Sequence, residues 1–349
     1  MTEQIMFSKK ENGVGIATLS REKALHSLTF DMISALYTQL KRWETDENVR
    51  VILLESRGTK AFCAGGDIKA LYQAKNNKQA FDQATAFFTL EYELDLYIAN
   101  YPKPIVVLMD GIVMGGGVGL SYGASHRIVT ERTKWAMPEV NISFFPDVGA
   151  CYFLSQTPDY TGRYAALTGS VLTASDAISI GCADYYIESD TLETCKQELV
   201  THHWDDYEEV TSQSVHLFLQ SFIQEPTQSE LMMNKDDIHK HFSFKTIEDI
   251  LTSLHNDSSR FAQDTYTLLE SKSPLSLKVT LAHLKQSKAS SLEETFETDK
   301  TLAKHFLQCD DFYEGVYSIL IDKSHKPVYS YETVAEVPDE LALSFFREH

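Results

Sequence analysis

Short apolar runs punctuate the first half of the chain, and each of them predicts a β-strand. Gln4 to Ser8 and Val14 to Leu19 flank the turn sequence Glu11-Asn12-Gly13, so they predict a hairpin. Three later apolar runs are of strand length and predict further strands: Arg50 to Ser56, Ile105 to Met109 and Arg127 to Thr130.

Helical spacing appears between these runs. Ile33, Leu36, Leu40 and Trp43 recur at intervals of three and four residues, which predicts an amphipathic helix, and Thr29 is suited to cap its N-terminus. Strands that alternate with helices are typical of an α/β fold. We therefore expect an α/β core.

The second half of the chain follows a different pattern. From Cys182 to His349 the only glycine is Gly315, and the sequence is polar with amphipathic segments. Four of these segments predict helices: Thr246 to Leu254, Ser259 to Glu270, Leu275 to Lys285 and Leu292 to Leu307. We expect a core over residues 1–205 and a helical C-terminal region over residues 206–349.

Composition narrows the range of partners. The chain of 349 residues carries 50 acidic and 31 basic side chains, a formal net charge of −19. Such a surface repels phosphate backbones and anionic lipid headgroups. The most apolar stretch, Ile105 to Leu120, is too short for a membrane span and is interrupted by Asp110. We expect neither a nucleic-acid partner nor a membrane partner.

Cysteine and histidine placement bears on compartment and metals. The five cysteines form no CxxC pair, so neither a disulfide framework nor a zinc ribbon is indicated, and a reducing compartment fits. The first residues show neither a secretory h-region nor an Arg-rich transit helix, so we expect a cytoplasmic protein. Pairs such as His202-His203 have no cysteine or carboxylate at zinc-ligand spacing. No metal site is expected.

Two glycine-rich loops are the first candidates for chemistry. Lys60 to Lys69 and Met109 to Gly119 each lie between a predicted strand and a predicted helix. Backbone N–H groups exposed in such loops bind anions, and glycine lets a ligand approach without a Cβ in the way. Taken singly, each loop is more often a tight turn than a site, but two together can form an oxyanion hole.

The chain resembles the enoyl-CoA hydratase/isomerase (crotonase) superfamily through three motifs. They are KALHSLT at Lys23 to Thr29, KAFCAGGDI at Lys60 to Ile68 and PKPIVVLMDGIVMGGGVGL at Pro102 to Leu120. The resemblance covers most of residues 1–190. It implies a crotonase-like ββα spiral core, and it maps the two oxyanion-hole amides onto Gly66 and Gly116.

The match departs from the hydratases at their first catalytic acid. Gly119 stands where they carry a glutamate, whereas Glu139 in Ala-Met-Pro-Glu keeps the second acid. Asp147 in Pro-Asp-Val-Gly replaces their usual glycine, which, with the extended C-terminal region, resembles the 3-hydroxyisobutyryl-CoA hydrolase branch. That likeness implies four substrate-binding positions: Glu91, Gly116, Glu139 and Asp147.

Thioester hydrolysis gives these residue types a consistent set of roles. Preorganised N–H donors stabilise the tetrahedral oxyanion, and a carboxylate either deprotonates water or attacks the carbonyl. We assign that carboxylate to Glu139, whose neighbours Pro138 and Phe145 imply an apolar setting that raises its pKa. Asp147 is suited to accept a hydrogen bond from a substrate hydroxyl, and both acids are counted as catalytic. No cofactor is expected, because coenzyme A is part of the acyl-CoA substrate.

Other functions remain open at this point. Gly119-Leu-Ser-Tyr-Gly123 matches the GxSxG elbow of serine hydrolases, but a glycine-rich loop precedes it and we expect Ser121 to lie within a helix. The chain could also be an enoyl-CoA hydratase or isomerase acting on another short acyl-CoA. A third possibility is a non-catalytic acyl-CoA-binding protein.

The family resemblance also implies a homo-oligomer.

Overall fold

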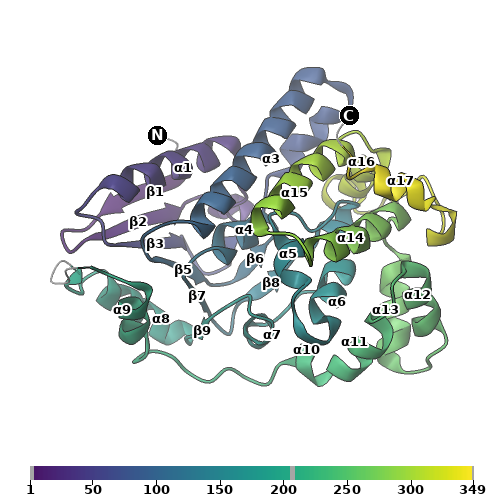
Figure 1. The fold of residues 1–349 in the computed structure, drawn as a ribbon. Helices are drawn as coiled ribbons and strands as arrows, with labels where there is room; N and C mark the ends of the chain where they lie inside the picture. Colours follow the sequence, from purple (N-terminus) through teal and green to yellow (C-terminus); the bar gives the residue numbers. More distant parts are fainter. Residues whose placement is uncertain (1–3, 205–208, 348–349) are drawn as a thin grey trace. The chain divides into compact units, whose positions relative to one another are not determined.

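The computed structural model describes residues 4–204 and 209–347 (Figure 1). The chain separates into two compact units. Unit 1 comprises Met1–Gly66, Glu93–Trp135 and Leu172–Glu230, and unit 2 comprises Asp67–Tyr92, Ala136–Val171 and Leu231–His349. The predicted boundary between residues 205 and 206 lies outside the described residues and stays a prediction. Each compact unit takes segments from both sides of it.

Unit 1 contains a six-stranded sheet in the order β1-β2-β3-β5-β7-β9 (Figure 1). The first pair is the predicted antiparallel hairpin, and the remaining pairs are parallel. The strand bounds are Ile5–Lys9, Val14–Leu19, Val51–Ser56, Ile105–Met109, His126–Val129 and Tyr185–Tyr186. The α/β prediction is therefore confirmed. The limits of the first five strands lie within one residue of those expected, whereas β9 was not predicted.

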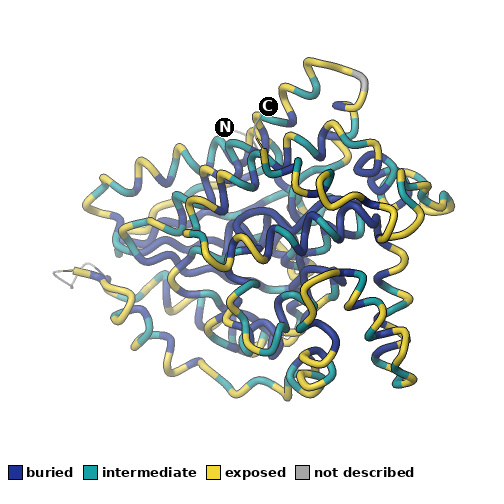
Figure 2. The backbone as a smooth tube through the Cα atoms, turned by 45° about the vertical axis from the view of Figure 1, so that its right-hand side comes forward, coloured by how far each residue is buried: buried dark blue, intermediate teal, exposed yellow. Residues whose placement is uncertain are grey.

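Helices cover both faces of this sheet. On one face α1 (Phe30–Thr45) places Trp43 against Phe7, with ring centroids 5.9 Å apart, and the Thr29 hydroxyl caps the helix by accepting from Met32 N–H at 3.3 Å. On the other, α8 (Ser189–Leu199) and α9 (Ser212–Leu219) pack on residues that include Val14, Leu53 and Val106. Burial on both faces explains why the central strands β3 and β5 are continuous apolar runs. Figure 2 draws buried parts of the backbone in dark blue.

A small sheet holds the two glycine loops in unit 1. It consists of β4 (Ala61–Cys63), β6 (Ile112–Met114) and β8 (Lys134–Ala136). Strand β4 lies within the stretch Lys60 to Lys69, for which the sequence predicted a loop. A Cβ at Gly117 would lie 2.3 Å from the Cys63 carbonyl oxygen, so only glycine permits the loops to pack this closely.

Unit 2 is mainly helical. Its four predicted C-terminal helices are confirmed as α12 (Ile247–His255), α13 (Arg260–Glu270), α14 (Pro274–Ser287) and α15 (Leu292–Phe306). The other helices with residues in this unit are α2 (Ile68–Leu71), the first part of α3 (Lys78–Ala99), α5 (Ala150–Leu154), α6 (Thr161–Thr168), α10 (Glu230–Met233), α11 (Lys235–Phe242), α16 (Asp310–Val316) and α17 (Asp339–Ser344). In unit 1, α4 (Gly116–Tyr122) and α7 (Ala174–Ser179) complete the set of described α-helices. Among the residues described, no helix is long and apolar enough to cross a bilayer.

Candidate active site

Unit 2 buries the three carboxyl groups that the sequence singles out. The exposed fractions are 2% for Glu91, 8% for Glu139 and 5% for Asp147. Glu91 comes from α3, Glu139 opens the 3₁₀ turn Glu139–Ile142, and Asp147 precedes α5. Asp147 interacts electrostatically with Glu91 and with Glu139, and Glu91 also interacts with Glu139. The fold therefore brings the three predicted acids together.

A tight turn presents Asp147. Val148 and Gly149 follow it with φ angles of +53° and +74°, both in the left-handed region, and Ala150 N–H donates to the Asp147 carbonyl at 2.9 Å. Valine is rarely found there because its branched side chain crowds the backbone. Such a conformation persists only where surrounding contacts enforce it.

Aromatic side chains exclude water from this part of unit 2. Phe144 and Phe145 are 1% and 0% exposed. Phe144 stacks on Phe88 of α3 at 5.4 Å, and Phe145 stacks on Phe306 of α15 at 5.5 Å. The segment between Glu139 and Asp147 is thus enclosed by rings from helices far away in the sequence.

Burial changes the protonation of all three acids. It raises the pKa of Glu139 well above its ordinary value, and the negative charges of Asp147 and Glu91 add to the effect. Burial likewise raises the pKa of Glu91, with a further contribution from Asp147. The pKa of Asp147 rises to about 7, mainly through burial, although the hydrogen bond from Tyr92 opposes the shift.

Hydrogen bonding distinguishes the three acids. The Tyr92 hydroxyl donates to Asp147 Oδ2 at 2.7 Å. Glu91 Oε1 and Glu139 Oε2, in contrast, are buried and have no hydrogen-bond partner among the described residues. A buried carboxylate oxygen without a partner is costly, which favours a role toward a ligand or a reacting water. Glu91 and Glu139 thus each keep one carboxyl oxygen that no described residue contacts by a hydrogen bond.

Unit 1 contains the two predicted oxyanion-hole glycines. Leu28 N–H donates to the Gly65 carbonyl at 2.8 Å, and Leu28 and Gly66 form a parallel β-bridge, so the backbone around Gly66 is held in place. Gly116 is the first residue of α4, and an N–H at that position has no partner within its own helix. Both amides are suited to donate to an anion, and their assignment as an oxyanion hole stays a prediction.

The serine-elbow reading does not fit the structure. Ser121 lies inside α4, as expected, and is only 1% exposed. Its hydroxyl donates to the Gly117 carbonyl of the preceding turn at 2.9 Å. A nucleophilic serine needs an exposed Oγ at a strand-to-helix turn, so the GxSxG match is coincidental.

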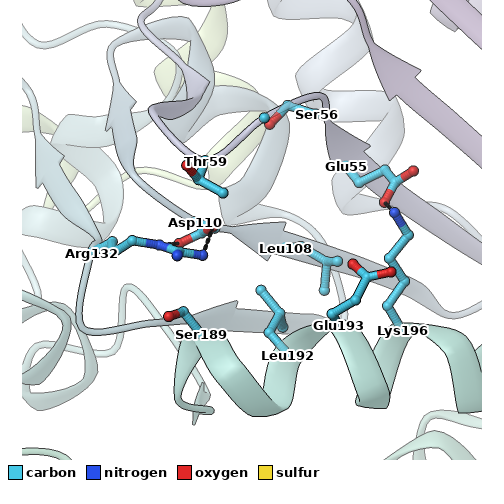
Figure 3. A pocket seen from close by; sticks show the side chains of 11 residues that line it. Glu55, Ser56, Thr59, Leu108, Asp110, Arg132, Ser189, Leu192, Glu193 and Lys196 are labelled. Atoms are coloured by element: carbon cyan, nitrogen blue, oxygen red, sulfur yellow. Dashed lines mark hydrogen bonds and ion pairs between the residues drawn. The ribbon is translucent and has the colours of Figure 1, made fainter.

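A hollow of about 220 Å³ in unit 1 contains none of the five predicted site residues (Figure 3). It lies at the carboxyl ends of β3 and β5, where Arg132 pairs with Asp110 at 2.5 Å and Lys196 with Glu55 at 2.5 Å. Its cations are therefore already neutralised. In residues 4–204 and 209–347, no group of three or more His, Cys, Asp or Glu side chains is arranged to hold a metal ion.

Two residues that contact the acid cluster were not predicted from the sequence. Tyr92 directly follows Glu91, but helical spacing alone did not indicate that its hydroxyl would reach Asp147. Asp299 lies 150 positions after Gly149, whose N–H donates to Asp299 Oδ2 at 2.8 Å. No local signal in the sequence reveals that contact.

Comparisons with known proteins agree with this architecture. The enoyl-CoA hydratase/isomerase family model matches residues 14–346. The chain belongs to this family. Among solved structures, a carnitinyl-CoA dehydratase from Mycobacterium thermoresistibile matches with a TM-score of 0.92 and 35% identity, over 100% of this chain and 97% of that one. An enoyl-CoA hydratase from Rhodobacter sphaeroides 2.4.1 has a TM-score of 0.88 and 29% identity, over 98% and 97%. The crotonase-like fold prediction is confirmed.

Curated relatives in the family carry a different name. The mitochondrial 3-hydroxyisobutyryl-CoA hydrolase of Xenopus laevis is 39% identical over 97% of this chain and 87% of its own length. The human protein of the same name is 36% identical over 99% of this chain and 89% of its own length. Nearly the whole chain, including the C-terminal helices, therefore has counterparts in these family members.

The raised pKa of Asp147 predicts how this family member's stability depends on pH. Between about pH 4 and pH 7 the folded carboxyl keeps a proton that the unfolded chain has released, so its contribution to stability falls as pH rises through this window. Asp147→Asn removes the charge but keeps an acceptor for Tyr92. We expect its melting temperature at pH 8 to exceed that of the wild type by about 2 to 4 °C, with a smaller difference at pH 5.

Asp264→Asn is the matched control, because Asp264 is exposed on α13. Its melting temperature should follow that of the wild type at both pH values. An Asp147→Asn protein that is equally destabilised at pH 5 and pH 8 would contradict the prediction. It would show that burial does not disfavour the ionised form of Asp147.

Proposed function

We propose that the chain hydrolyses 3-hydroxyisobutyryl-CoA to 3-hydroxyisobutyrate and coenzyme A. The observation that carries this proposal is the buried cluster of Glu91, Glu139 and Asp147 in unit 2. Gly119 cannot act as the second acid that water addition requires, so the cluster favours hydrolysis over hydration. The names of the curated relatives support the same reaction.

Glu139 is the reacting carboxylate of the proposed mechanism. Either it takes a proton from water, whose oxygen then attacks the thioester carbonyl, or it attacks the carbonyl itself and forms an anhydride that water later hydrolyses. In both routes the C–S bond breaks, and the sulfur leaves as coenzyme A thiolate and is protonated. When water attacks the thioester, water supplies the new oxygen of the acid product. When Glu139 attacks, the first product carries away an oxygen of Glu139, and the water that opens the anhydride at the Glu139 carbonyl replaces that oxygen. Single turnover in heavy-oxygen water distinguishes the two routes, since only attack by water on the thioester labels the first product.

Backbone amides stabilise the developing charge in this proposal. The carbonyl oxygen becomes an oxyanion when the carbonyl is attacked, and the N–H groups of Gly66 and Gly116 are the assigned donors. Removing one such donor typically costs about a hundred- to thousandfold in rate. Because both donors belong to the backbone, their positions depend on the close packing at Gly65 and Gly117 within unit 1.

Asp147 is assigned to the substrate's hydroxyl group. An ionised carboxylate only accepts hydrogen bonds, and the Tyr92 hydroxyl already donates to its Oδ2 atom. The remaining lone pairs suit the hydroxyl on the third carbon of the acyl chain. Glu91 lies in the same buried cluster and is assigned to substrate binding.

Enoyl-CoA hydration is the second candidate function. The solved structures described above are named as a dehydratase and a hydratase, and the former is 35% identical to this chain. Both reactions begin with an acyl-CoA thioester whose carbonyl is polarised. The substrate used therefore discriminates between them, and a non-catalytic acyl-CoA-binding protein would turn over none.

The proposal includes three further expectations about the protein's setting. No cofactor is required, since coenzyme A arrives with the substrate. The five free cysteines suit a reducing compartment, and we retain the cytoplasm as the proposed location although the curated relatives are named mitochondrial. Cell fractionation tests this. Assembly into a homo-oligomer is proposed from the family likeness, and sedimentation measures it.

The proposed role of Glu139 predicts the effect of a single substitution. Glu139→Gln keeps the size of the side chain but removes the basic and nucleophilic oxygen, so thiol release should fall by about a thousandfold or more. The measurement is steady-state thiol release from 3-hydroxyisobutyryl-CoA with circular dichroism on the same sample. Glu293→Gln, an exposed position in the first turn of α15, should retain wild-type turnover. Near-normal turnover by a folded Glu139→Gln protein would reject the assignment.

The proposed role of Asp147 predicts selectivity for thioesters that carry the hydroxyl group. A site that pairs a buried carboxylate with a substrate hydroxyl rejects analogues that lack it, because the charge is left unpaired. We expect kcat/KM for 3-hydroxyisobutyryl-CoA to exceed that for isobutyryl-CoA by about a hundredfold or more, the lower bound allowing for a water that replaces the hydroxyl. Asp147→Asn should narrow the gap.

Crotonyl-CoA completes this substrate panel. Loss of its conjugated thioester absorbance should be much slower than hydrolysis of the hydroxy thioester. Hydration at a comparable rate would make the second candidate function the better one. Equal kcat/KM for the hydroxylated and unsubstituted thioesters would remove Asp147 from substrate recognition.

A further inference from the structure

Two C-terminal helices of unit 2 bury an ionisable pair. His283 of α14 and Asp299 of α15 are both 0% exposed, with Nε2 and Oδ1 2.6 Å apart. The other ring nitrogen of His283 lies 3.3 Å from the Ser287 hydroxyl. This arrangement orients the imidazole so that Nε2–H donates to Asp299.

The second carboxylate oxygen of Asp299 reaches the turn that carries Asp147. Asp299 Oδ2 accepts the N–H of Gly149 at 2.8 Å. A Cβ added to Gly149 would lie 3.0 Å from Leu292 Cδ1, so helix α15 packs directly on the turn. Both oxygens of Asp299 are therefore used, one to meet His283 and one to hold the backbone two residues after Asp147.

Strain at the turn explains why such an anchor is needed. Val148 has a φ of +53°, a conformation that a β-branched residue adopts at an energetic cost. Without the Gly149 hydrogen bond, the chain would relax toward a more common backbone conformation. That relaxation would rotate Asp147 away from the position in which Tyr92 holds its carboxylate.

We propose that the buried Asp299–His283 pair is a positioning device for Asp147, fixing the turn so that the carboxylate meets the hydroxyl group of the substrate. Neither residue of the pair acts on the reacting atoms. The inference rests on the proposed function, because the hydroxyl is that of the 3-hydroxyacyl thioester. It also gives the C-terminal helices a role in selectivity.

Charge provides a second route by which the pair affects Asp147. The groups that interact with Asp147 come from four elements and are Glu91 and Tyr92 of α3, Glu139 of the 3₁₀ turn, Cys151 of α5 and Asp299 of α15. The negative charge of Asp299 contributes to the raised pKa of Asp147. Removing that charge should lower the pH at which Asp147 loses its proton.

The test compares Asp299→Asn with a matched control, Asp311→Asn. Asp311 is a buried aspartate of α16 in the same unit, 1% exposed, that accepts from the Ser273 hydroxyl at 2.8 Å and from Ser330 N–H at 2.7 Å. Both variants lose one buried charge within a hydrogen-bonded set. Only the Asp299 variant changes the side chain that accepts the Gly149 N–H.

Asp299→Asn should reduce the selectivity for 3-hydroxyisobutyryl-CoA over isobutyryl-CoA by about tenfold or more, since small misplacements of a contact group carry costs of this order. Turnover of isobutyryl-CoA should change by less than about threefold. Asp311→Asn should leave the ratio of the two kcat/KM values unchanged. Infrared titration without substrate should show Asp147 deprotonating at lower pH in Asp299→Asn.

Asp299→Asn could instead lose hydrolysis of both thioesters equally, with the ratio of kcat/KM values and the infrared titration unchanged from the wild type. That result would overturn the inference, and the pair would then only stabilise the packing of α14 on α15. A wild type that treats both thioesters alike would overturn it as well. A wild type that releases no thiol from either thioester contradicts the proposed function instead. In that event the infrared titration still decides whether Asp299 acts on Asp147.

A second pair of variants covers the case in which Asp299→Asn does not fold. His283→Gln keeps an N–H group able to donate to Asp299, whereas His283→Leu leaves Asp299 Oδ1 without its donor. We expect the glutamine variant to retain the wild-type selectivity ratio and the leucine variant to lose it by about tenfold. Equal ratios in these two variants would reject the positioning role.

Discussion

Unit 2 removes three carboxyl groups from water within one small region, and this burial governs the chemistry proposed for the site. Charged carboxylates are expensive to bury, and like charges held close together make each ionisation harder. Glu91, Glu139 and Asp147 bear both costs, since all are buried and Asp147 acts on the other two. A carboxylate formed there is poorly solvated and therefore more reactive as a base or nucleophile than one at the surface.

The C-terminal helices maintain this environment. Phe306 of α15 covers the segment that links Glu139 to Asp147, and Asp299 anchors the turn after Asp147. The helical region is thus more than an appendage to an α/β core. It supplies apolar side chains that exclude water and so raise the pKa values of Glu139 and Asp147. It also supplies the hydrogen bond that holds the strained turn after Asp147 in place. Family members that share the core but not these helices would need other means to place an acid at the Asp147 position.

Sequence patterns predicted the elements whose stability is local. The spacing of Ile33, Leu36 and Leu40 and the cap at Thr29 identified α1, and the four amphipathic segments gave α12 to α15, because periodicity and capping are encoded within each segment. Strand β4 was missed because three residues carry too little pattern. The candidate acids were found through the family likeness, and their shared burial then agreed with it.

Tertiary contacts could not be predicted in the same way. The bond from Gly149 to Asp299 joins residues 150 positions apart, and the bond from Tyr92 to Asp147 joins residues 55 positions apart. Nothing in either local sequence distinguishes these residues from ordinary helix or turn positions. Their roles follow only from how helices pack, which a single sequence does not state.

The dependence of wild-type kcat/KM on pH, measured by thiol release from 3-hydroxyisobutyryl-CoA, tests whether the buried acids perform the hydrolysis. If the buried acids perform the hydrolysis, the activity must rise as they lose their protons, and the rise should lie well above the ordinary carboxyl value of about 4, because burial raises the pKa of Glu139. A profile that is already flat from pH 5 upward would show that the reacting group is not a buried carboxylate. That result would contradict the assignment of Glu139 as the reacting group.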